Sequence, residues 1–413
     1  MLFTDTQLAS LAAQFSNDPS QLRTASIAVE CDPLSLVRAG SELFARSSFF
    51  RAPAGEEVGS LGVAVSFDAA GTDRFANLEA ELCGLPELTD GARIVLGFSF
   101  NPEGPSDPEW DGFASADAVL PAVCITKGSS GGRLVVAVPS GADADRLIEL
   151  LGGLIEPDEP PPPDPGAHNV ESVPSTVEWQ SEVAEAVGAI DDGSIQKVVL
   201  ARSVRVDSER ATDPYGLVHH LAIANPSCYI YSVVVGESAF VGASPELLLA
   251  QQGREIWINP LAGSARRGKG ADDVAVGDEL LSSAKNRGEH AIVVDDLVAR
   301  LGQLTERIEY PDGPQLRRMA TVQHLSTEID GTLCDGVSTF DVLASIHPTP
   351  AVGGTPRAEA LAFIDKAELI DRGWYSGGVG WVDPGGGAQV ALALRCALIT
   401  GVTSRLYAGN GIV

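Results

Sequence analysis

The chain has 413 residues, of which 44% are hydrophobic and 20% are charged. This composition is typical of a globular protein with a substantial core. Its uninterrupted apolar runs are far shorter than the roughly 20 residues that a membrane helix needs, so an integral membrane protein is excluded. The 28 Lys and Arg residues stand against 56 Asp and Glu residues, giving a net charge of −28. Because such an acidic surface repels phosphate backbones and anionic lipids, we expect neither nucleic acid nor a membrane surface as a partner.

The six cysteines are far apart in the chain and have no zinc-ligand spacing. This usage is typical of reduced thiols in a cytoplasmic protein. The N-terminal residues carry Asp5 and no basic region, so they do not resemble a signal peptide. We therefore expect a cytoplasmic location.

Residues 1–155 contain short patterned segments but no catalytic constellation. Helical spacing of apolar residues predicts helices, and apolar runs between turn residues predict strands. The predicted helices are 8–15 and 142–151, and the predicted strands are 62–67, 93–100 and 133–139.

A proline-rich stretch follows these segments. Six of the ten residues from 156 to 165 are proline. Such a sequence favours extended polyproline II and cannot hold a helix or a central strand. We interpret residues 156–174 as a surface loop. It separates an N-terminal half, residues 1–155, from a C-terminal half, residues 175–413.

After the loop the pattern becomes more regular. Ser175 or Thr176 can cap a helix that runs to about Asp191. The pattern also predicts one long helix, 278–304, and strands at 197–206, 229–235, 240–249, 255–260, 390–399 and 404–408. Because the strands come in groups and do not alternate regularly with helices, we expect an α+β fold.

Lys197 and Glu246 are candidates for proton transfer. Lys197 begins a strand that is mostly apolar on both faces, where burial would lower its pKa and make the neutral amine available as a base. Glu246 follows a Ser-Pro turn and precedes three leucines, where apolar surroundings would raise the carboxyl pKa and suit an acid. Each segment by itself favours a simpler alternative, namely a side chain that faces solvent.

Three further segments could hold an anionic ligand or a cation. Gly263 and Ser264 lie in a loop whose N–H groups could approach a carboxylate, although an ordinary basic turn is the simpler interpretation. Glu289 on a helix could face inward and bind Mg²⁺, or lie on a solvated face. Arg395 interrupts an apolar strand, so a buried guanidinium would need either a ligand carboxylate or a structural salt bridge.

Together these segments resemble the motifs of the chorismate-utilising enzymes. That family includes isochorismate synthase, anthranilate synthase, aminodeoxychorismate synthase and salicylate synthase. The motifs occur in the family's order over residues 176–413. They are Lys197–Arg202, Gly242–Glu246, Pro260–Arg267, Glu289-His290, Gln323–Leu325, His347–Ala351, Gly377–Trp381, Arg395-Cys396 and Tyr407–Val413.

Within the family, the sequence is most similar to isochorismate synthases of the siderophore type. Lys197 stands where anthranilate synthases carry a glutamine, and Ala262 stands where many aminodeoxychorismate synthases carry a lysine. Ala351 stands where salicylate synthases tend to carry threonine. The alternatives are a salicylate synthase, which adds pyruvate elimination, and a non-catalytic chorismate-binding homologue.

The resemblance implies a large two-sheet α/β sandwich of the anthranilate synthase type, one structural domain with a variable N-terminal half. It implies that Lys197 activates water to attack C2 of chorismate, and that Glu246 protonates the departing C4 hydroxyl. It also implies Mg²⁺ bound by Glu289, a monomer, and no glutamine amidotransferase subunit. The implied substrate-binding positions are Gly263, Ser264, His324, Ala351, Tyr375, Arg395 and Gly409.

The sequence departs from the family pattern at three places. Asn286 stands where an acid is common one turn before Glu289, and Asn410 replaces the usual small residue. The family continues past Gly-Ile-Val with metal-binding glutamates and a substrate-binding lysine, whereas this sequence stops at Val413. Either those residues follow in the complete protein, or half of the metal site is missing.

Overall fold

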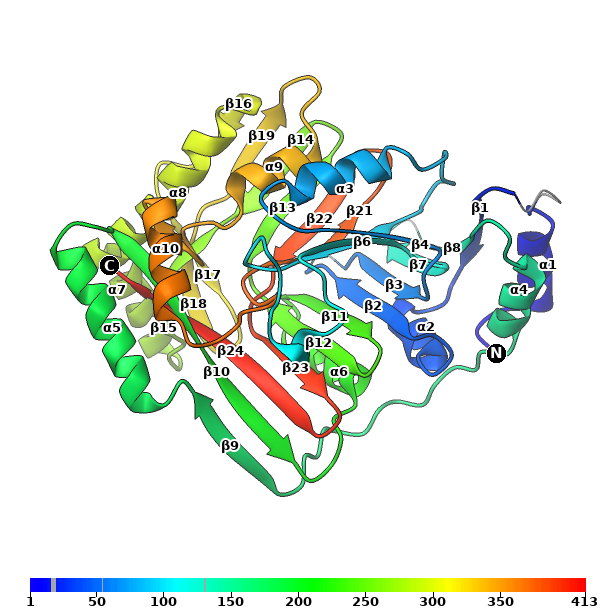
Figure 1. Ribbon diagram of the computed structural model, residues 1–413, viewed down its shortest axis with the longest axis horizontal. Helices are drawn as coiled ribbons and strands as arrows, with labels where there is room; N and C mark the ends of the chain where they lie inside the picture. The colour runs from blue at the N-terminus through cyan, green and yellow to red at the C-terminus, as the bar shows by residue number, and fades with distance from the viewer. Residues whose placement is uncertain (16–19, 54, 130) are drawn as a thin grey trace.

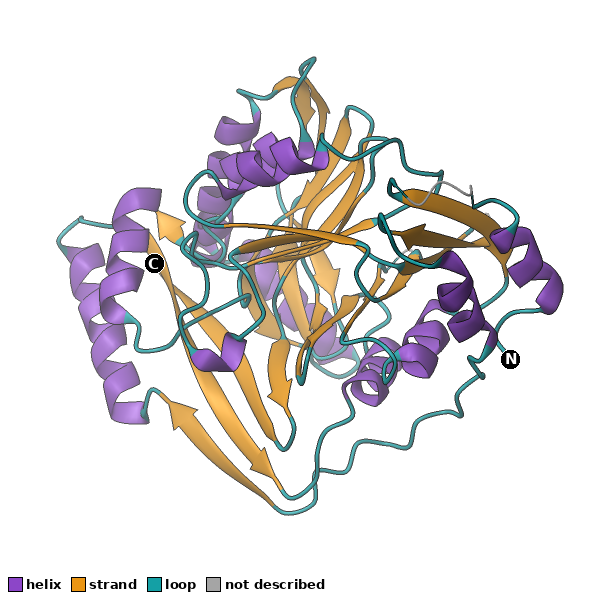
Figure 2. Cartoon of the chain, turned by 45° about the vertical axis from the view of Figure 1, so that its right-hand side comes forward, coloured by secondary structure: helices purple, strands orange, loops and turns teal. Residues whose placement is uncertain are grey.

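The computed structural model describes residues 1–15, 20–53, 55–129 and 131–413. Two large antiparallel sheets form its centre, and helices surround them (Figures 1 and 2). A small three-stranded sheet completes the strand structure. The predicted α+β class is therefore confirmed. Among the described helices, none is long and apolar enough to cross a membrane.

The larger sheet has 12 strands in the order β1-β8-β7-β3-β2-β11-β12-β23-β24-β10-β20, with β9 paired to β10. Every pairing in it is antiparallel. Its strands are β1 Arg23–Val29, β2 Arg46–Arg51, β3 Glu57–Leu61, β7 Val123–Gly128, β8 Gly131–Val138, β9 His168–Val173, β10 Lys197–Ser208, β11 Tyr229–Val235, β12 Ser238–Ser244, β20 Gly354–Thr355, β23 Cys396–Thr400 and β24 Thr403–Ile412.

The second sheet has nine strands in the order β16-β19-β14-β13-β22-β21-β5-β6-β4. They are β4 Val65–Ala69, β5 Ile94–Phe98, β6 Ala116–Leu120, β13 Leu247–Gln252, β14 Glu255–Asn259, β16 Thr305–Glu309, β19 Ile329–Leu333, β21 Gly378–Val382 and β22 Gly387–Leu392. The small sheet contains β15 Leu261–Arg266, β17 Gln315–Arg318 and β18 Val322–Ser326.

The helices lie outside the two sheets (Figure 1). They are α1 Asp5–Ala12, α2 Pro33–Gly40, α3 Arg74–Leu82, α4 Ala144–Gly152, α5 Thr176–Asp191, α6 Pro214–Ala224, α7 Ala271–Ser282, α8 Ala284–Leu301, α9 Thr339–Ile346 and α10 Arg357–Ala367. The helix predicted after the proline-rich loop is confirmed as α5. Ser175 caps it in a capping box with Glu178.

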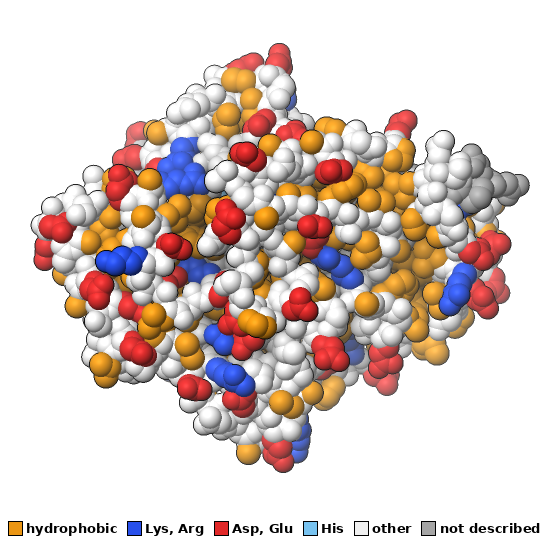
Figure 3. Space-filling view, in the orientation of Figure 1, with side chains coloured by type: hydrophobic (Ala, Val, Ile, Leu, Met, Phe, Trp, Pro, Cys, Tyr) orange, Lys and Arg blue, Asp and Glu red, His pale blue; other side chains and the backbone are white. Residues whose placement is uncertain are grey.

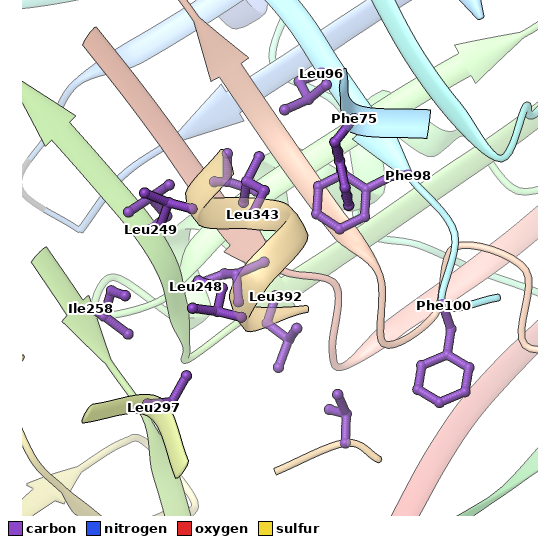
Figure 4. Close-up of a cluster of buried hydrophobic side chains, with 14 of the residues drawn as sticks. Phe75, Leu96, Phe98, Phe100, Leu248, Leu249, Ile258, Leu297, Leu343 and Leu392 are labelled. Atoms are coloured by element: carbon purple, nitrogen blue, oxygen red, sulfur yellow. The ribbon is translucent and has the colours of Figure 1, made fainter. Parts of the chain in front are cut away.

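Strands from the N-terminal half and from the rest of the chain pair within each large sheet. In the larger sheet β2 pairs with β11, and in the second sheet β5 pairs with β21. Apolar side chains fill the space between the sheets and beneath the helices. In Figure 4, Leu343 of α9 lies among Leu248, Leu249 and Leu392 of β13 and β22. This burial holds α9 against the second sheet.

Three elements predicted as continuous are interrupted, so those predictions are wrong in extent. The predicted strand 240–249 splits into β12 and β13, because Pro245 and Glu246 leave one sheet and enter the other. The predicted helix 278–304 splits into α7 and α8 at Ser283, which is extended and caps α8 through its hydroxyl. The predicted strand 390–399 splits into β22 and β23 around Arg395, whose φ is 49°.

Two further predictions need correction. The predicted strand 62–67 begins too early, because Gly62 has a φ of 68° in the turn after β3, and the strand that follows, β4, covers Val65–Ala69 in the other sheet. The prediction that residues 156–174 form a loop is wrong at its C-terminal end, where β9 pairs with β10. The proline-rich part is an extended trace between α4 and β9 (Figure 1).

Candidate functional site

Lys197 lies at the start of β10, and its side chain is only 1% exposed. It is therefore buried and does not reach solvent. Burial lowers the pKa of its amine, while Glu289 and Glu246 act in the opposite direction. A lysine in this environment gives up its proton more readily than one in water.

Glu289 of α8 faces Lys197, with its Oε1 3.3 Å from Lys197 Nζ. Gly411 of β24 makes room for this carboxylate, because a Cβ at Gly411 would lie 2.7 Å from Glu289 Oε1. In the register of β10 and β24, Val199 lies opposite Gly411 and Ala201 lies opposite Gly409. Directly opposite residues share a face of the sheet, so Lys197, Gly409 and Gly411 point to one side.

Glu246 lies in the crossing between β12 and β13 and is 4% exposed. Burial raises the pKa of its carboxyl group to about 8, although the N–H of Leu261, Lys197 and Arg317 oppose that shift. Leu261 N–H donates to Oε1 at 3.3 Å. Ser244 fixes the turn, because its hydroxyl donates to Leu392 O at 2.6 Å and accepts from Glu246 N–H at 3.2 Å. The carboxyl group is thus held in place and protonated near neutral pH.

Ser264, His324 and Arg395 form a hydrogen-bonded chain. Arg395 Nη2 donates to His324 Nε2 at 2.8 Å, and Nδ1 lies 2.8 Å from Ser264 Oγ. Burial and the two neighbouring cations Arg395 and Arg317 lower the pKa of His324 to about 4. The ring is therefore neutral near pH 7 and can accept from Arg395 while Nδ1–H donates to Ser264.

The interpretation of Arg395 as a buried residue within a strand is wrong. Its backbone is in the left-handed region between β22 and β23, and its side chain is exposed. Gly263 also has a positive φ, 78°, and lies at an irregularity in the pairing of β15 with β18. A glycine adopts that conformation without the steric cost of a Cβ.

Tyr375 is buried and stacks on Tyr407, with ring centroids 5.3 Å apart. Its hydroxyl approaches Gly409, where a Cβ would lie 2.6 Å from Tyr375 Oη. Gly409 and Gly411 therefore keep the β24 face open beside Tyr375 and Glu289. Ala351 lies in the turn after α9 and is half-buried, and in the part of the chain that the structure describes no hydrogen bond joins it to Lys197 or Glu246.

Sequence reasoning missed a buried ion pair that supports β10. Arg372 and Glu368, 3% and 5% exposed, form an i, i+4 pair. Arg372 Nη2 donates to Val199 O at 2.7 Å, and Glu368 Oε1 accepts from Ala201 N–H at 2.7 Å. The pair thus holds the strand just after Lys197. In the sequence, the i, i+4 spacing of Glu368 and Arg372 is the feature that could have indicated this ion pair.

Glu289 is the carboxylate that could take part in holding a divalent cation. The described residues contain no group of three or more His, Cys, Asp or Glu side chains placed to hold a metal ion. Asn286 lies one turn earlier on α8, and its Nδ2 donates to Ser283 Oγ at 2.9 Å. Mg²⁺ commonly uses one or two carboxylates together with substrate oxygens and water, and one carboxylate with an amide oxygen fits that smaller donor set.

Residues 8–413 match the family model described as chorismate binding enzyme. The salicylate biosynthesis isochorismate synthase of Pseudomonas aeruginosa is 35% identical over 367 residues, which are 85% of this chain and 77% of that protein. The isochorismate synthase MenF of Bacillus subtilis is 35% identical over 331 residues, covering 78% of this chain and 70% of that protein.

The solved structure of the menaquinone-specific isochorismate synthase MenF from Escherichia coli has a TM-score of 0.85 with this chain. The two are 25% identical, and the match covers 99% of this chain and 94% of the other. The fold implied by the sequence motifs, with two large sheets and outer helices, is therefore confirmed.

The raised pKa of Glu246 predicts how stability changes with pH. The unfolded carboxyl group ionises near 4.5, whereas the folded one keeps its proton to about pH 8. The unfolded state therefore binds fewer protons between these values, and wild-type stability falls as pH rises through that window. Glu246→Gln has no proton to lose. Its stability relative to wild type should rise across the window and then level off, as measured by unfolding midpoints below, within and above it.

Glu237→Gln is the matched control, because Glu237 is exposed in a turn. Its difference from wild type should be small and nearly constant with pH. A constant difference for Glu246→Gln as well would show that Glu246 does not retain its proton in the folded protein.

Proposed function

The chain belongs to the chorismate-binding enzyme family, and we propose that it is an isochorismate synthase, an isomerase that converts chorismate to isochorismate. The observation that carries the proposal is the opposite perturbation of two buried groups. Lys197 has a lowered pKa and Glu246 a raised one, so the site holds a potential base and a protonated acid at the same pH. Relatives named isochorismate synthase, which match most of this chain, support it.

The proposed reaction uses these groups in turn. Neutral Lys197 takes a proton from a water molecule, whose oxygen attacks C2 of the chorismate ring. The ring double bonds shift, the C4–oxygen bond breaks, and Glu246 gives its proton to the leaving hydroxyl. One water molecule is added and one is released, so the net change is an isomerisation. Proton exchange with solvent then returns Lys197 and Glu246 to their starting forms.

The proposed substrate-binding groups supply positive charge that the protein lacks overall. Chorismate is a dianion, whereas the chain carries −28 and its acidic side chains are spread over the face shown in Figure 3. We assign the enolpyruvyl carboxylate to Arg395 and the backbone at Gly409. Ser264, His324 and Tyr375 contact the rest of the ligand, with Gly263 and Ala351 beside them.

Magnesium is the proposed cofactor, with Glu289 as its ligand in the described chain. Bound Mg²⁺ would bring positive charge to the ring carboxylate and would compete with Lys197 for Glu289. Without its ion-pair partner, the buried amine of Lys197 loses its proton more easily. A cation bound at Glu289 would therefore increase the tendency of Lys197 to lose its proton.

The finer assignments rest on the sequence motifs. Ala351 stands where salicylate synthases tend to carry threonine, so we propose that the reaction stops at isochorismate. We also propose that the protein is of the siderophore subtype, is cytoplasmic, and is a monomer without an amidotransferase subunit. A chorismate-binding half at residues 175–413 and a variable half at residues 1–155 also belong to it.

Product analysis tests the proposed function. The protein is incubated with chorismate and Mg²⁺, quenched, and the products are separated by chromatography. We expect isochorismate without salicylate or pyruvate, because the site holds the pair needed for the isomerisation. Salicylate with pyruvate would instead identify a salicylate synthase. Retention of all chorismate, with binding intact, would identify a non-catalytic homologue.

Replacing Lys197 tests the proposed base. Lys197→Ala should lower kcat by roughly 10²- to 10⁴-fold, which is the usual contribution of a positioned proton-transfer group. Chorismate should still bind in an equilibrium titration, because Arg395 and Gly409 are unchanged. Lys127→Ala, at an exposed lysine, is the control and should retain full activity. Full activity in Lys197→Ala would remove Lys197 as the base.

Metal dependence tests the role of Glu289. Turnover should stop in EDTA and return when Mg²⁺ is added in excess. Glu289→Gln should need a higher Mg²⁺ concentration for half-maximal rate, because it removes the charged ligand but keeps an amide oxygen. Turnover that is unaffected by EDTA would contradict the metal assignment.

A further inference from the structure

A large cavity lies beside the candidate site, with Glu368 and Arg372 in its wall. Its volume is about 950 Å³, and it is bounded by α3, the loop of residues 101–106, α9 and α10. None of Lys197, Glu246 or Arg395 lines it. Its volume is within the range of small-molecule sites.

Two arginines line this cavity without a carboxylate partner. Arg74, 3% exposed at the start of α3, donates to neutral oxygens only, namely those of Ser99, Asn101 and Ser115. Arg357, at the start of α10, donates to the backbone oxygens of Ser345 and His347. Across the described ranges, neither guanidinium lies within ion-pair distance of an acidic side chain.

Burial is the largest effect on both arginines and lowers the pKa of each to about 10. Arg357 lowers the pKa of Arg74 further, which places the two charges within mutual influence. Both charges also help to lower the pKa of buried His347, which lines the cavity, to about 3. The histidine is therefore neutral and adds no third charge. Two like charges buried together are stabilised by an anion between them.

The acids that line the cavity do not pair with the two arginines, and Asp296, which acts on Arg357 from outside the lining, is itself paired with Arg300. Glu368 is paired with Arg372. Asp371 accepts backbone N–H groups from Asp107 and Gly373, each at 2.8 Å, and so holds the neighbouring loop. Glu103 and Asp365 are exposed at the rim, where water and salt screen them. The interior therefore offers positive charge to a ligand.

The remaining wall is apolar and aromatic. The side chains that form it are Phe75, Phe100, Leu361, Ile364, Leu369 and Ile370. An apolar wall beside two guanidinium groups matches a molecule with a ring and a carboxylate. Inorganic phosphate would use the charges but leave the apolar wall in contact with water.

We propose that this cavity is a second ligand site, which binds a small ring-bearing carboxylate through Arg74 and Arg357. The inference does not depend on chorismate turnover, because it concerns binding at residues that take no part in the proposed reaction. The cavity also borders Glu368 and Arg372, which hydrogen-bond to β10. A bound ligand therefore lies one side chain away from the strand that carries Lys197.

Calorimetric titration with benzoate tests the proposal, with benzamide as the uncharged probe of the same shape and 1-naphthoate as the larger carboxylate. We expect saturable binding of at least one carboxylate and at least tenfold weaker binding of benzamide.

Arg357→Gln keeps a hydrogen-bond donor but removes the charge, and it should weaken carboxylate binding at least tenfold. Leu361→Trp keeps both charges but fills the cavity, and it should abolish binding. Arg146→Gln, at an exposed arginine, and Lys197→Ala should bind as wild type does.

Unfolding midpoints of each variant are measured first, so that only folded variants are compared. Loss of binding in Arg395→Ala, with binding intact in Leu361→Trp, would place the carboxylate in the candidate active site and overturn the proposal. Equal binding of benzamide and benzoate would remove the role of the two arginines. Failure of both carboxylates to bind wild-type protein would likewise overturn it.

Discussion

The burial of one amine at the start of a central strand constrains the structure around it. Lys197 is almost fully enclosed, and an isolated buried ammonium group would be costly. Glu289 approaches it from α8, and that approach needs a residue without a side chain beside it, which Gly411 of β24 provides. The Glu368–Arg372 pair holds the backbone of β10 at Val199 and Ala201. Helix, strand and ion pair together fix the position of a single nitrogen atom.

Burial shifts the pKa values of Lys197 and Glu246 in opposite directions, because one group is a base and the other an acid. Lys197 and Glu246 are each buried and each lose water, so the neutral form of both is favoured. A direct ion pair between Lys197 and Glu246 would favour the charged form of both groups. Glu246 instead receives the N–H of Leu261, while Lys197 contacts Glu289. The strand crossing that carries Glu246 from one sheet to the other thus gives it its own hydrogen-bond partner, while each group still acts on the pKa of the other.

Much of this arrangement was predictable from the sequence, and the rest depended on long-range contacts. The apolar faces of β10 predict a central strand, and Ser175 predicts the start of α5, because these are local signals. The prediction of a continuous strand through Arg395 is wrong. Apolar neighbours on both sides favour such a strand, and no local pattern reveals a residue with positive φ. The Glu368–Arg372 pair was missed, because its role depends on backbone atoms about 170 residues away. Local patterns predict elements, whereas the partners of buried charges come from topology.

The pairing of early strands with strands much later in the chain has a consequence for synthesis. Leu96 of β5 pairs with Gly380 of β21, and Phe50 of β2 pairs with Tyr231 of β11. A ribosome must therefore complete nearly the whole chain before the second sheet can close, and the early strands present open edges in the meantime. Contacts between such distant residues slow folding, and open strand edges attract other chains. The protein thus most needs protection from aggregation while only its N-terminal half has been synthesised. Synthesis of the late strands near Gly380 ends the exposure of the early strand edges.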